Sequence, residues 1–193
     1  MRAVIWVQGC PLRCRDCIAS ESLSFAGGMT RDVTELAGWL CALADVEGVT
    51  LSGGEPFAQA EALALLLDEV RVTRPEFTAM SYSGFTLAAL RRGTPAQRAL
   101  LGRLDLLVDG PYQVARHADL RWRGSSNQRL IALTDRYRDV LPRPDTGAGL
   151  EFTVGLDGTM SWAGVPGVPG FRDLITTELA SRGYRLQVEK EGS

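Results

Sequence analysis

The chain has 193 residues, 45% of them hydrophobic, which is enough for one globular domain with its own core. Its 21 basic and 23 acidic residues are mixed along the sequence and give a formal net charge of -2. The overall charge therefore gives no reason to expect binding to nucleic acid or to a membrane. The apolar run at residues 3–7 is too short for a signal sequence, and no later run approaches the roughly 20 residues of a membrane span. We expect a single domain over residues 1–193, in the cytoplasm.

Short β-rich runs alternate with longer helical patterns in the first half of the chain. The pattern predicts strands at residues 3–7, 48–52, 77–82 and 104–108. It predicts helices that run from a cap at 30–32 to about 44, over 61–72, and over 87–101 with a break at 94–95. Such alternation predicts a parallel sheet with helices packed outside it.

Residues 111–146 are less regular and rich in arginine. A strand at 150–154, a helix at 171–182 and a strand at 184–188 then resume the alternation. A complete eight-unit barrel takes roughly 250 residues, which is more than this chain has. We therefore expect an α/β fold in the form of an open, partial (β/α)6 barrel.

Glycine-bearing loops follow each of the first four predicted strands. They are a cysteine loop, "SGGEPF" at 52–57, "SYSGFT" at 81–86 and "VDGPY" at 108–112. Glycine lets the backbone come close to a ligand and adopt dihedral angles closed to other residues. Any one of these loops alone is consistent with an ordinary turn, but four at the same edge of a sheet favour a ligand site.

The first loop, "VQGCPLRCRDC", contains Cys10, Cys14 and Cys17. A structural zinc ion needs four ligands, and neither Cys41, in an apolar helical pattern, nor His117, in an arginine-bearing loop, has ligand-like surroundings. In a reducing compartment such cysteines are more often metal ligands or redox groups than disulfides. Three thiolates can ligate three irons of an iron-sulfur cube and leave the fourth open to a substrate or cofactor.

With its Cys-x3-Cys-x2-Cys motif and the following "GGEP", the chain resembles the radical S-adenosylmethionine superfamily. The resemblance implies a 4Fe-4S cluster on Cys10, Cys14 and Cys17, whose open iron chelates S-adenosylmethionine. It also implies reductive cleavage of that cofactor to methionine and a 5′-deoxyadenosyl radical, which abstracts a hydrogen atom from a substrate.

A closer resemblance is to the activating proteins of anaerobic ribonucleotide reductases, carried by "VQGCPLRCRDC", "SYSGFT", "LLVDGPY" and "WRGSSNQRLI". It implies a large glycyl-radical enzyme as partner and an electron donor of the reduced flavodoxin or ferredoxin type. In such a site Gly53 and Gly54 would offer backbone carbonyls to the methionine amino group, while serine and aspartate oxygens would suit amino or ribose contacts. The implied cofactor-binding residues are Gly53, Gly54, Glu55, Pro56, Ser81, Ser83 and Asp109.

Two features of the sequence stand apart from this resemblance. Many members of the superfamily have an aromatic residue before the third cysteine, near the adenine, where this chain has Asp16, followed by Cys17 and Ile18. The polar run from Arg123 to Gln128 has two interpretations, as a functional motif or as a well hydrogen-bonded loop tied to the barrel.

Three functions are consistent with the sequence. The first is an activase that generates a glycyl radical on a partner enzyme, whose loop enters the open side of the barrel. The second is a radical enzyme that abstracts hydrogen directly from a small molecule or a peptide. The third is a non-enzymatic iron or zinc module, for which the glycine-rich loops would have no purpose.

Overall fold

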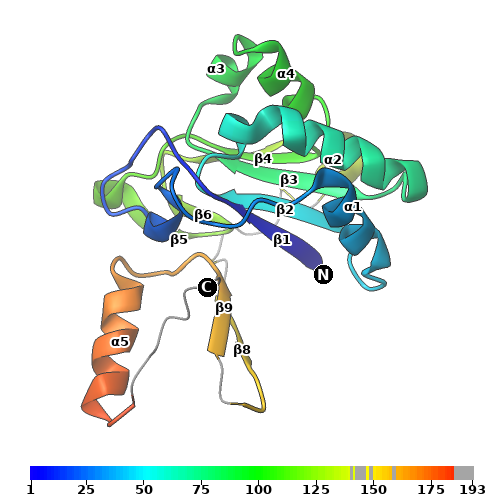
Figure 1. Cartoon of the computed structure of the whole chain (residues 1–193). Coiled ribbons are helices and arrows are strands. Elements are labelled where there is room, and N and C mark those ends of the chain that lie inside the picture. The colour runs from blue at the N-terminus through cyan, green and yellow to red at the C-terminus, as the bar shows by residue number, and fades with distance from the viewer. Residues whose placement is uncertain (140, 142–146, 148–149, 158–159, 185–193) are drawn as a thin grey trace.

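The computed structural model describes residues 1–139, 141, 147, 150–157 and 160–184. Its main sheet holds four parallel strands that lie side by side in sequence order, as Figure 1 shows. They are β1 (Arg2–Val7), β2 (Gly48–Gly53), β3 (Thr78–Ser83) and β4 (Leu106–Asp109). The four strands predicted in the first half of the sequence are confirmed, with small shifts at their ends.

Four helices connect these strands: α1 (Val33–Ala42), α2 (Ala60–Thr73), α3 (Leu87–Arg91) and α4 (Pro95–Leu101). The carboxylate of Asp32 accepts hydrogen bonds from the first turn of α1 and so fixes where that helix begins. Thr94 caps α4 in a capping box with Gln97, and Pro95 follows it at the first helical position. The predicted break between α3 and α4 is therefore confirmed.

The helices lie on one face of the sheet (Figure 1). Because each strand pairs with the next one in the sequence, right-handed crossovers bring every connecting helix to the same side. The main core lies between these two layers and includes Leu40, Leu51, Leu66 and Leu67, which are fully buried. The other face holds a smaller cluster of Met80, Leu106 and Val108, with Tyr82 and Trp122 packed against it.

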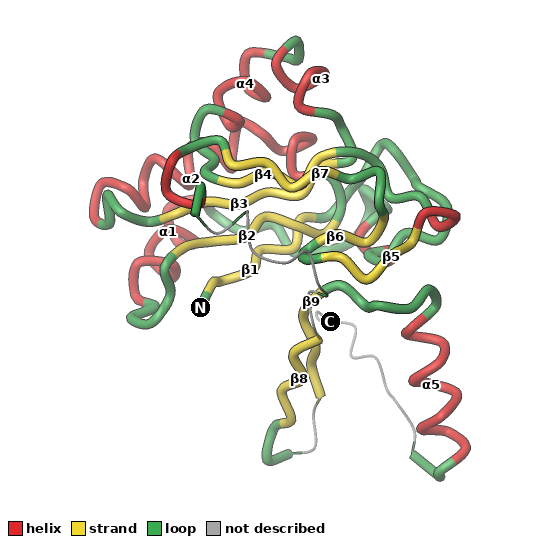
Figure 2. The backbone as a smooth tube through the Cα atoms, turned by 180° about the vertical axis from the view of Figure 1, so that it is seen from behind, coloured by secondary structure: helices red, strands yellow, loops and turns green. Residues whose placement is uncertain are grey.

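The described part of the less regular segment after β4 contains three short strands. β5 (His117–Leu120) and β6 (Arg123–Ser125) pair with each other, and β7 (Arg129–Ala132) pairs antiparallel with β4. Figure 2 shows β7 at the end of the main sheet. Four short 3-10 helices complete the connections: η1 (Ser20–Ser22), η2 (Pro56–Gln59), η3 (Val114–Arg116) and η4 (Asp135–Tyr137).

The predicted strand at 150–154 is present as β8 (Leu150–Val154), but it does not join the main sheet. It pairs antiparallel with β9 (Met160–Gly164), and aromatic contacts of Phe171 join this ribbon to α5 (Phe171–Ser181). The strand predicted at 184–188 extends beyond the described residues. The α/β class and the open, mostly parallel sheet are confirmed, whereas the described residues contain four parallel strands in place of the six expected.

None of the helices in the described part of the chain combines the length and the apolar character that a membrane crossing requires.

An ion pair joins β4 to β7 at the edge of the sheet where the parallel strands end. The side chain of Asp109 is 1% exposed, and Arg129 on β7 donates to it from Nε at 2.9 Å and from Nη2. The same carboxylate accepts a hydrogen bond from the backbone N–H of Leu87, at the start of α3, at 2.6 Å. Asp109 therefore links three elements, and its charge depends on Arg129 for neutralisation.

Replacement of Arg129 with methionine is expected to lower the free energy of unfolding by about 1–3 kcal/mol, because it leaves the buried Asp109 carboxylate without its cation. Urea denaturation of the apoprotein measures this difference. The control is Arg182→Met, which removes an exposed ion pair with Glu178 on α5 and is expected to cost less than about 1 kcal/mol. Equal losses in the two variants would contradict the structural role of the Asp109 pair.

Candidate functional site

The loops that follow the four parallel strands meet at one edge of the sheet. In the sheet register Val7 lies opposite Gly53, and Ser83 lies opposite Asp109, so the strands end nearly level. A cavity of about 330 Å³ opens at this edge and on the inner face of the sheet. Its wall includes the cysteines of the first loop and the glycines of the second: Cys10, Cys14, Cys17, Gly53 and Gly54.

Backbone hydrogen bonds close the base of the cysteine loop. The N–H of Gly9 donates to Ser22 O at 2.8 Å, and that of Cys10 donates to Leu23 O at 3.0 Å. These bonds bring the two ends of the loop together, so the residues between them fold back over the ends of the strands.

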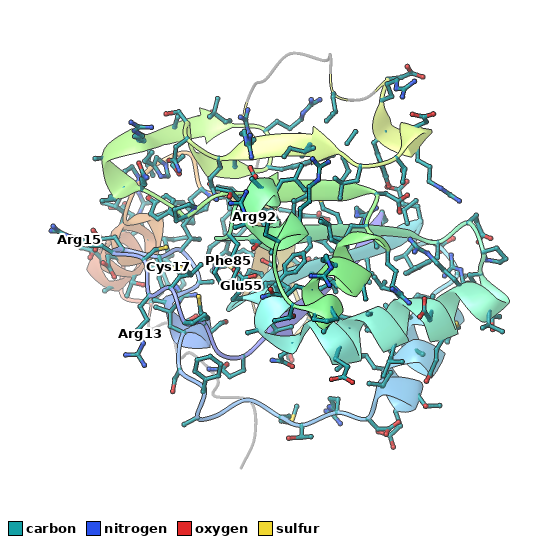
Figure 3. The ribbon with its side chains drawn as sticks, turned by 90° about the horizontal axis from the view of Figure 1, so that it is seen from above. Arg13, Arg15, Cys17, Glu55, Phe85 and Arg92 are labelled. Carbon is teal, nitrogen blue, oxygen red and sulfur yellow. The ribbon has the colours of Figure 1, made fainter. Side chains whose placement is uncertain are left out.

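Two residues inside the loop adopt left-handed backbone conformations. Arg13 has a φ of 47° and Asp16 a φ of 54°, and each directly precedes a cysteine. Figure 3 shows Arg13 and Arg15 pointing outward while Cys17 lies on the inner side of the loop. Aspartate is among the few residues that adopt this conformation readily, which gives a physical reason for Asp16 at a position where many relatives of the superfamily have an aromatic residue.

The end of β2 lies directly against the base of the cysteine loop. The N–H of Gly54 donates to Val7 O at 2.7 Å, and the N–H of Glu55 donates to Gly9 O at 2.9 Å. A Cβ on Gly53 would lie 2.6 Å from Val7 O, and one on Gly54 would lie 2.3 Å from Gly9 O. From the sequence we expected a ligand to lie close to the backbone of these glycines. The structure shows that the backbone of the cysteine loop lies close to them.

The carboxylate of Glu55 joins the loops that follow β2 and β3. It is 1% exposed and accepts hydrogen bonds from Phe57 N at 3.0 Å, Ser83 Oγ at 2.9 Å and Gly84 N at 2.8 Å. Burial raises the pKa of Glu55, and these three hydrogen bonds oppose that rise. With both oxygens engaged, Glu55 is suited to hold the rim of the cavity in place, and Pro56 lies buried behind it at the start of η2.

The three cysteines of the loop influence one another. Burial raises the pKa of the Cys14 thiol, nearby Cys10 raises it further, and the backbone N–H of Tyr112 opposes the rise. Burial also raises the pKa of Cys17, with contributions from Cys14 and Cys10. The structure thus brings the three predicted ligands together in one cavity wall.

This donor set fits an iron-sulfur cluster, which proteins hold through cysteine thiolates. Within the described residues, no group of three His, Cys, Asp or Glu side chains could hold a single metal ion. Cys41 lies in the last turn of α1, where its Sγ points to Val70 O at 4.0 Å. In the described structure Cys41 is not part of the cavity wall, as expected for a thiol outside the ligand set.

The structure does not bring two of the predicted cofactor-binding residues to the cavity. Ser81 is fully buried, and its Oγ donates to Tyr82 O at 2.9 Å. Ser81 lies opposite Leu51 in the sheet register, and Leu51 belongs to the core between the sheet and the helices, so Ser81 faces the helices. Asp109 is engaged by Arg129 and Leu87, so its oxygens are not presented to a ligand. Ser83 does line the cavity, with its hydroxyl bonded to Glu55.

The sequence interpretation missed the residues of the inner sheet face. Thr50, Tyr82 and Trp122 line the cavity, and burial raises the pKa of Tyr82 to about 12, which keeps it neutral. At the other end of the strands, the guanidinium of Arg2 donates to Thr50 Oγ1 at 3.0 Å and to Tyr137 OH at 2.7 Å. The alternation of side chains along β2 and β3 could have identified Thr50 and Tyr82 as residues that face the cavity.

Comparison with known proteins identifies a matching family. A model described as a 4Fe-4S single cluster domain matches residues 1–131. Three similar curated proteins are each called anaerobic ribonucleoside-triphosphate reductase-activating protein. The one from Pasteurella multocida is 35% identical over 141 residues, covering 69% of this chain and 88% of its own length. Those from Haemophilus influenzae and Enterobacteria phage T4 are 34% and 30% identical, over 66% and 69% of this chain and 84% and 85% of their own lengths.

Replacement of Gly54 with alanine is expected to displace the cysteine loop, because the new methyl group would collide with Gly9 O. Overpacking of this kind costs about 1–3 kcal/mol of stability. Iron content after anaerobic reconstitution should fall below that of the parent, as measured by colorimetric iron assay. The control is Gly38→Ala in α1, where a Cβ meets nothing within 4 Å and alanine should stabilise the helix by about 0.5–1 kcal/mol. Parental iron content in Gly54→Ala would show that the close contact is not what requires the glycine.

Proposed function

The chain belongs to the family of 4Fe-4S single cluster domains and, within it, to the radical S-adenosylmethionine activating proteins of anaerobic ribonucleoside-triphosphate reductases; from this premise we propose how its cavity works. Cys10, Cys14 and Cys17 would hold three irons of one 4Fe-4S cluster, and S-adenosylmethionine would occupy the rest of the cavity. When bound, the cluster supplies the electron that cleaves S-adenosylmethionine to methionine and a 5′-deoxyadenosyl radical. The observation that carries this assignment is the convergence of the three cysteines on one cavity wall.

The protein groups around the cavity have separate roles in this proposal. The backbone of Gly53 and Gly54 borders the space beside the cysteines, where their peptide groups are suited to contact the amino acid part of S-adenosylmethionine. Glu55 and Ser83 fix the position of this rim through their mutual hydrogen bond. Tyr82 remains neutral and adds an aromatic wall without introducing a charge.

The substrate would be a backbone glycine of the partner reductase. The chemistry supplied there would be removal of one hydrogen atom from the glycine Cα, which would yield 5′-deoxyadenosine and a glycyl radical. Among the residues that the structure describes, β1 is the last strand at its side of the sheet, and its inner residues Val4 and Trp6 are 37% and 53% exposed. This uncovered side offers an entrance for a loop of the partner protein.

The electron donor would be a reduced flavodoxin or ferredoxin. Cys14 and Cys17 are partly exposed, so the cluster would lie near the protein surface. Arg13 and Arg15, both exposed, flank Cys14; Arg15 forms an ion pair with Asp16 at 3.4 Å, so these three side chains keep one net positive charge where an acidic electron carrier would approach. The need for such a donor and for free thiols is consistent with action in the cytoplasm.

The whole chain, residues 1–193, would form a single radical S-adenosylmethionine domain. The family model ends at residue 131, but Gly164 and Val165 also line the cavity. An ion pair between Arg172 of α5 and Glu21 connects the C-terminal part to the segment that ends the cysteine loop. The residues beyond the family match therefore contribute to the site in this proposal.

The first test concerns the ligand set. Anaerobically reconstituted protein should hold about four irons and four sulfides, the content of one cube. Cys10→Ala, Cys14→Ala and Cys17→Ala should each lose the cluster, as measured by iron and sulfide assay and by the visible absorption spectrum. Cys41→Ala serves as the matched control and should retain it. A cluster that depends on Cys41 would refute the three-cysteine assignment.

The second test concerns the hydrogen donor. Reduced, cluster-loaded protein mixed with S-adenosylmethionine and the cognate reductase should produce a glycyl radical, detected by electron paramagnetic resonance. Replacing the glycine that bears the radical with alanine in the reductase should abolish the signal. Rapid turnover with a small metabolite and no protein partner would instead support a radical enzyme that acts directly on small molecules.

A further inference from the structure

β1 lies at the opposite end of the main sheet from β7 (Figure 2). In the described part of the chain it pairs with β2 alone, so one of its two edges has no partner strand. An unpaired edge presents a row of backbone N–H and C=O groups that can pair with another strand. β1 can therefore accept a further strand at this free edge.

A hydrogen bond of Val7 shows which residues of β1 direct their backbone groups to the free edge. Val7 O accepts from Gly54 N at 2.7 Å, so the backbone groups of Val7 are directed to β2. Along a strand, successive residues direct their backbone groups to alternate sides. The backbone N–H and C=O groups of Val4 and Trp6 are therefore directed to the free edge.

The side chains of the same two residues face the cavity. Val4 and Trp6 line it together with the three cysteines, and more than a third of each of the two residues is exposed. Their neighbours Ala3 and Val7 are buried in the main core, on the other face of the sheet. Val4 and Trp6 thus offer a partner both backbone hydrogen bonds and apolar surface, beside the cysteines.

The one charged residue of β1, Arg2, is engaged on the sheet. Its side chain is 15% exposed, and its guanidinium donates to Thr50 Oγ1 at 3.0 Å and to Tyr137 OH at 2.7 Å. Edge strands are commonly protected from pairing by exposed charged side chains, by proline or by a bulge. β1 has no exposed charge or proline of its own, so its free edge is open to a partner strand.

The course of β1 leads a partner strand to the cysteines. β1 ends at Val7, and Cys10 follows three residues later. The N–H of Gly9 donates to Ser22 O, so pairing along the free edge ends before Gly9. A strand that pairs with β1 lies about 4.8 Å from it and reaches this point beside the cavity wall.

The activity of an activase determines what kind of segment this edge would hold. A backbone glycine of the reductase has to enter the cavity, and the segment that carries it has to be held in place. Backbone hydrogen bonds to an edge strand hold an extended segment, while its side chains occupy neighbouring apolar surface. Large aromatic residues such as Trp6 contribute strongly to binding at protein interfaces.

We propose that β1 is a docking strand for the reductase. An extended segment next to the glycine that bears the radical pairs with the free edge at Val4 and Trp6, and a side chain of that segment packs on the Trp6 ring. The inference rests on the activase role given under the proposed function, and it adds how the substrate segment is bound.

The first experiment uses the parent protein without any substitution. Hydrogen exchange of the cluster-loaded protein is measured with and without the cognate reductase, at single-amide resolution, by mass spectrometry with electron-transfer dissociation. The amides of Val4 and Trp6 should exchange roughly tenfold or more slowly in the complex. Those of Ile5 and Val7, which are directed to β2, should exchange slowly in both states and serve as internal controls.

The second experiment tests the backbone hydrogen bonds through the Kd of the reductase, measured anaerobically by biolayer interferometry. Val4→Pro removes an N–H from the free edge and leaves the pairing with β2 intact. Val4→Thr is its matched control, because threonine has a similar shape and keeps that N–H. The Kd should rise roughly three- to tenfold in Val4→Pro and stay close to the parental value in Val4→Thr.

The same measurement tests the aromatic contact. Trp6→Ala should raise the Kd of the reductase roughly tenfold or more. The matched control is Trp39→Ala on α1, because Trp39 is 46% exposed and is not part of the cavity wall in the described structure. It should keep the parental Kd.

Unchanged exchange at the Val4 and Trp6 amides, in a complex that does form, would overturn the docking strand whatever the variants show. A parental Kd in both Val4→Pro and Trp6→Ala would also overturn it, and in either case the proposed function would stand. A cluster-loaded parent that does not bind the reductase would overturn the proposed function as well.

Discussion

The backbone of residues 53–55 lies against the backbone of residues 7–9 with no side chain between them, and the site depends on this contact. The two hydrogen bonds from Gly54 and Glu55 satisfy amides that water cannot easily reach and fix the cysteine loop to the end of β2. Glu55 then extends the connection to β3 through Ser83 and Gly84. The ends of three adjacent strands consequently behave as one rigid rim, and the cysteine loop starts from it.

The parts of the fold that the sequence predicted well are those coded by neighbouring residues. The strands at the start of the chain are short apolar runs, and the Asp32 cap and the Thr94–Pro95 break are local signals at helix ends. The three cysteines also lie close together in sequence, so a single tight loop was bound to bring them near one another. Their role as one group in a cavity wall follows from this local spacing and from the order of the strands.

The parts that the sequence did not predict depend on contacts between distant residues. The apolar pattern of residues 150–154 indicates a strand but does not indicate its partner, and here the partner is β9 in place of the main sheet. Ser81 was placed in the site because it lies near the end of a strand, yet one residue of alternation turns it to the helices. Asp109 was expected at the cofactor, but Arg129 on an unpredicted antiparallel strand engages its charge.

The order of these contacts along the chain has a consequence for protein synthesis. All three proposed cysteine ligands lie within the first 17 residues, whereas Tyr112 and Gln128 of the cavity wall belong to the second half of the sequence. A ribosome therefore exposes three unpaired thiols long before it makes the segments that enclose them. Contacts so far apart in sequence form late because of the cost in chain entropy. The nascent protein therefore passes through a stage in which every proposed ligand is present without the enclosing wall.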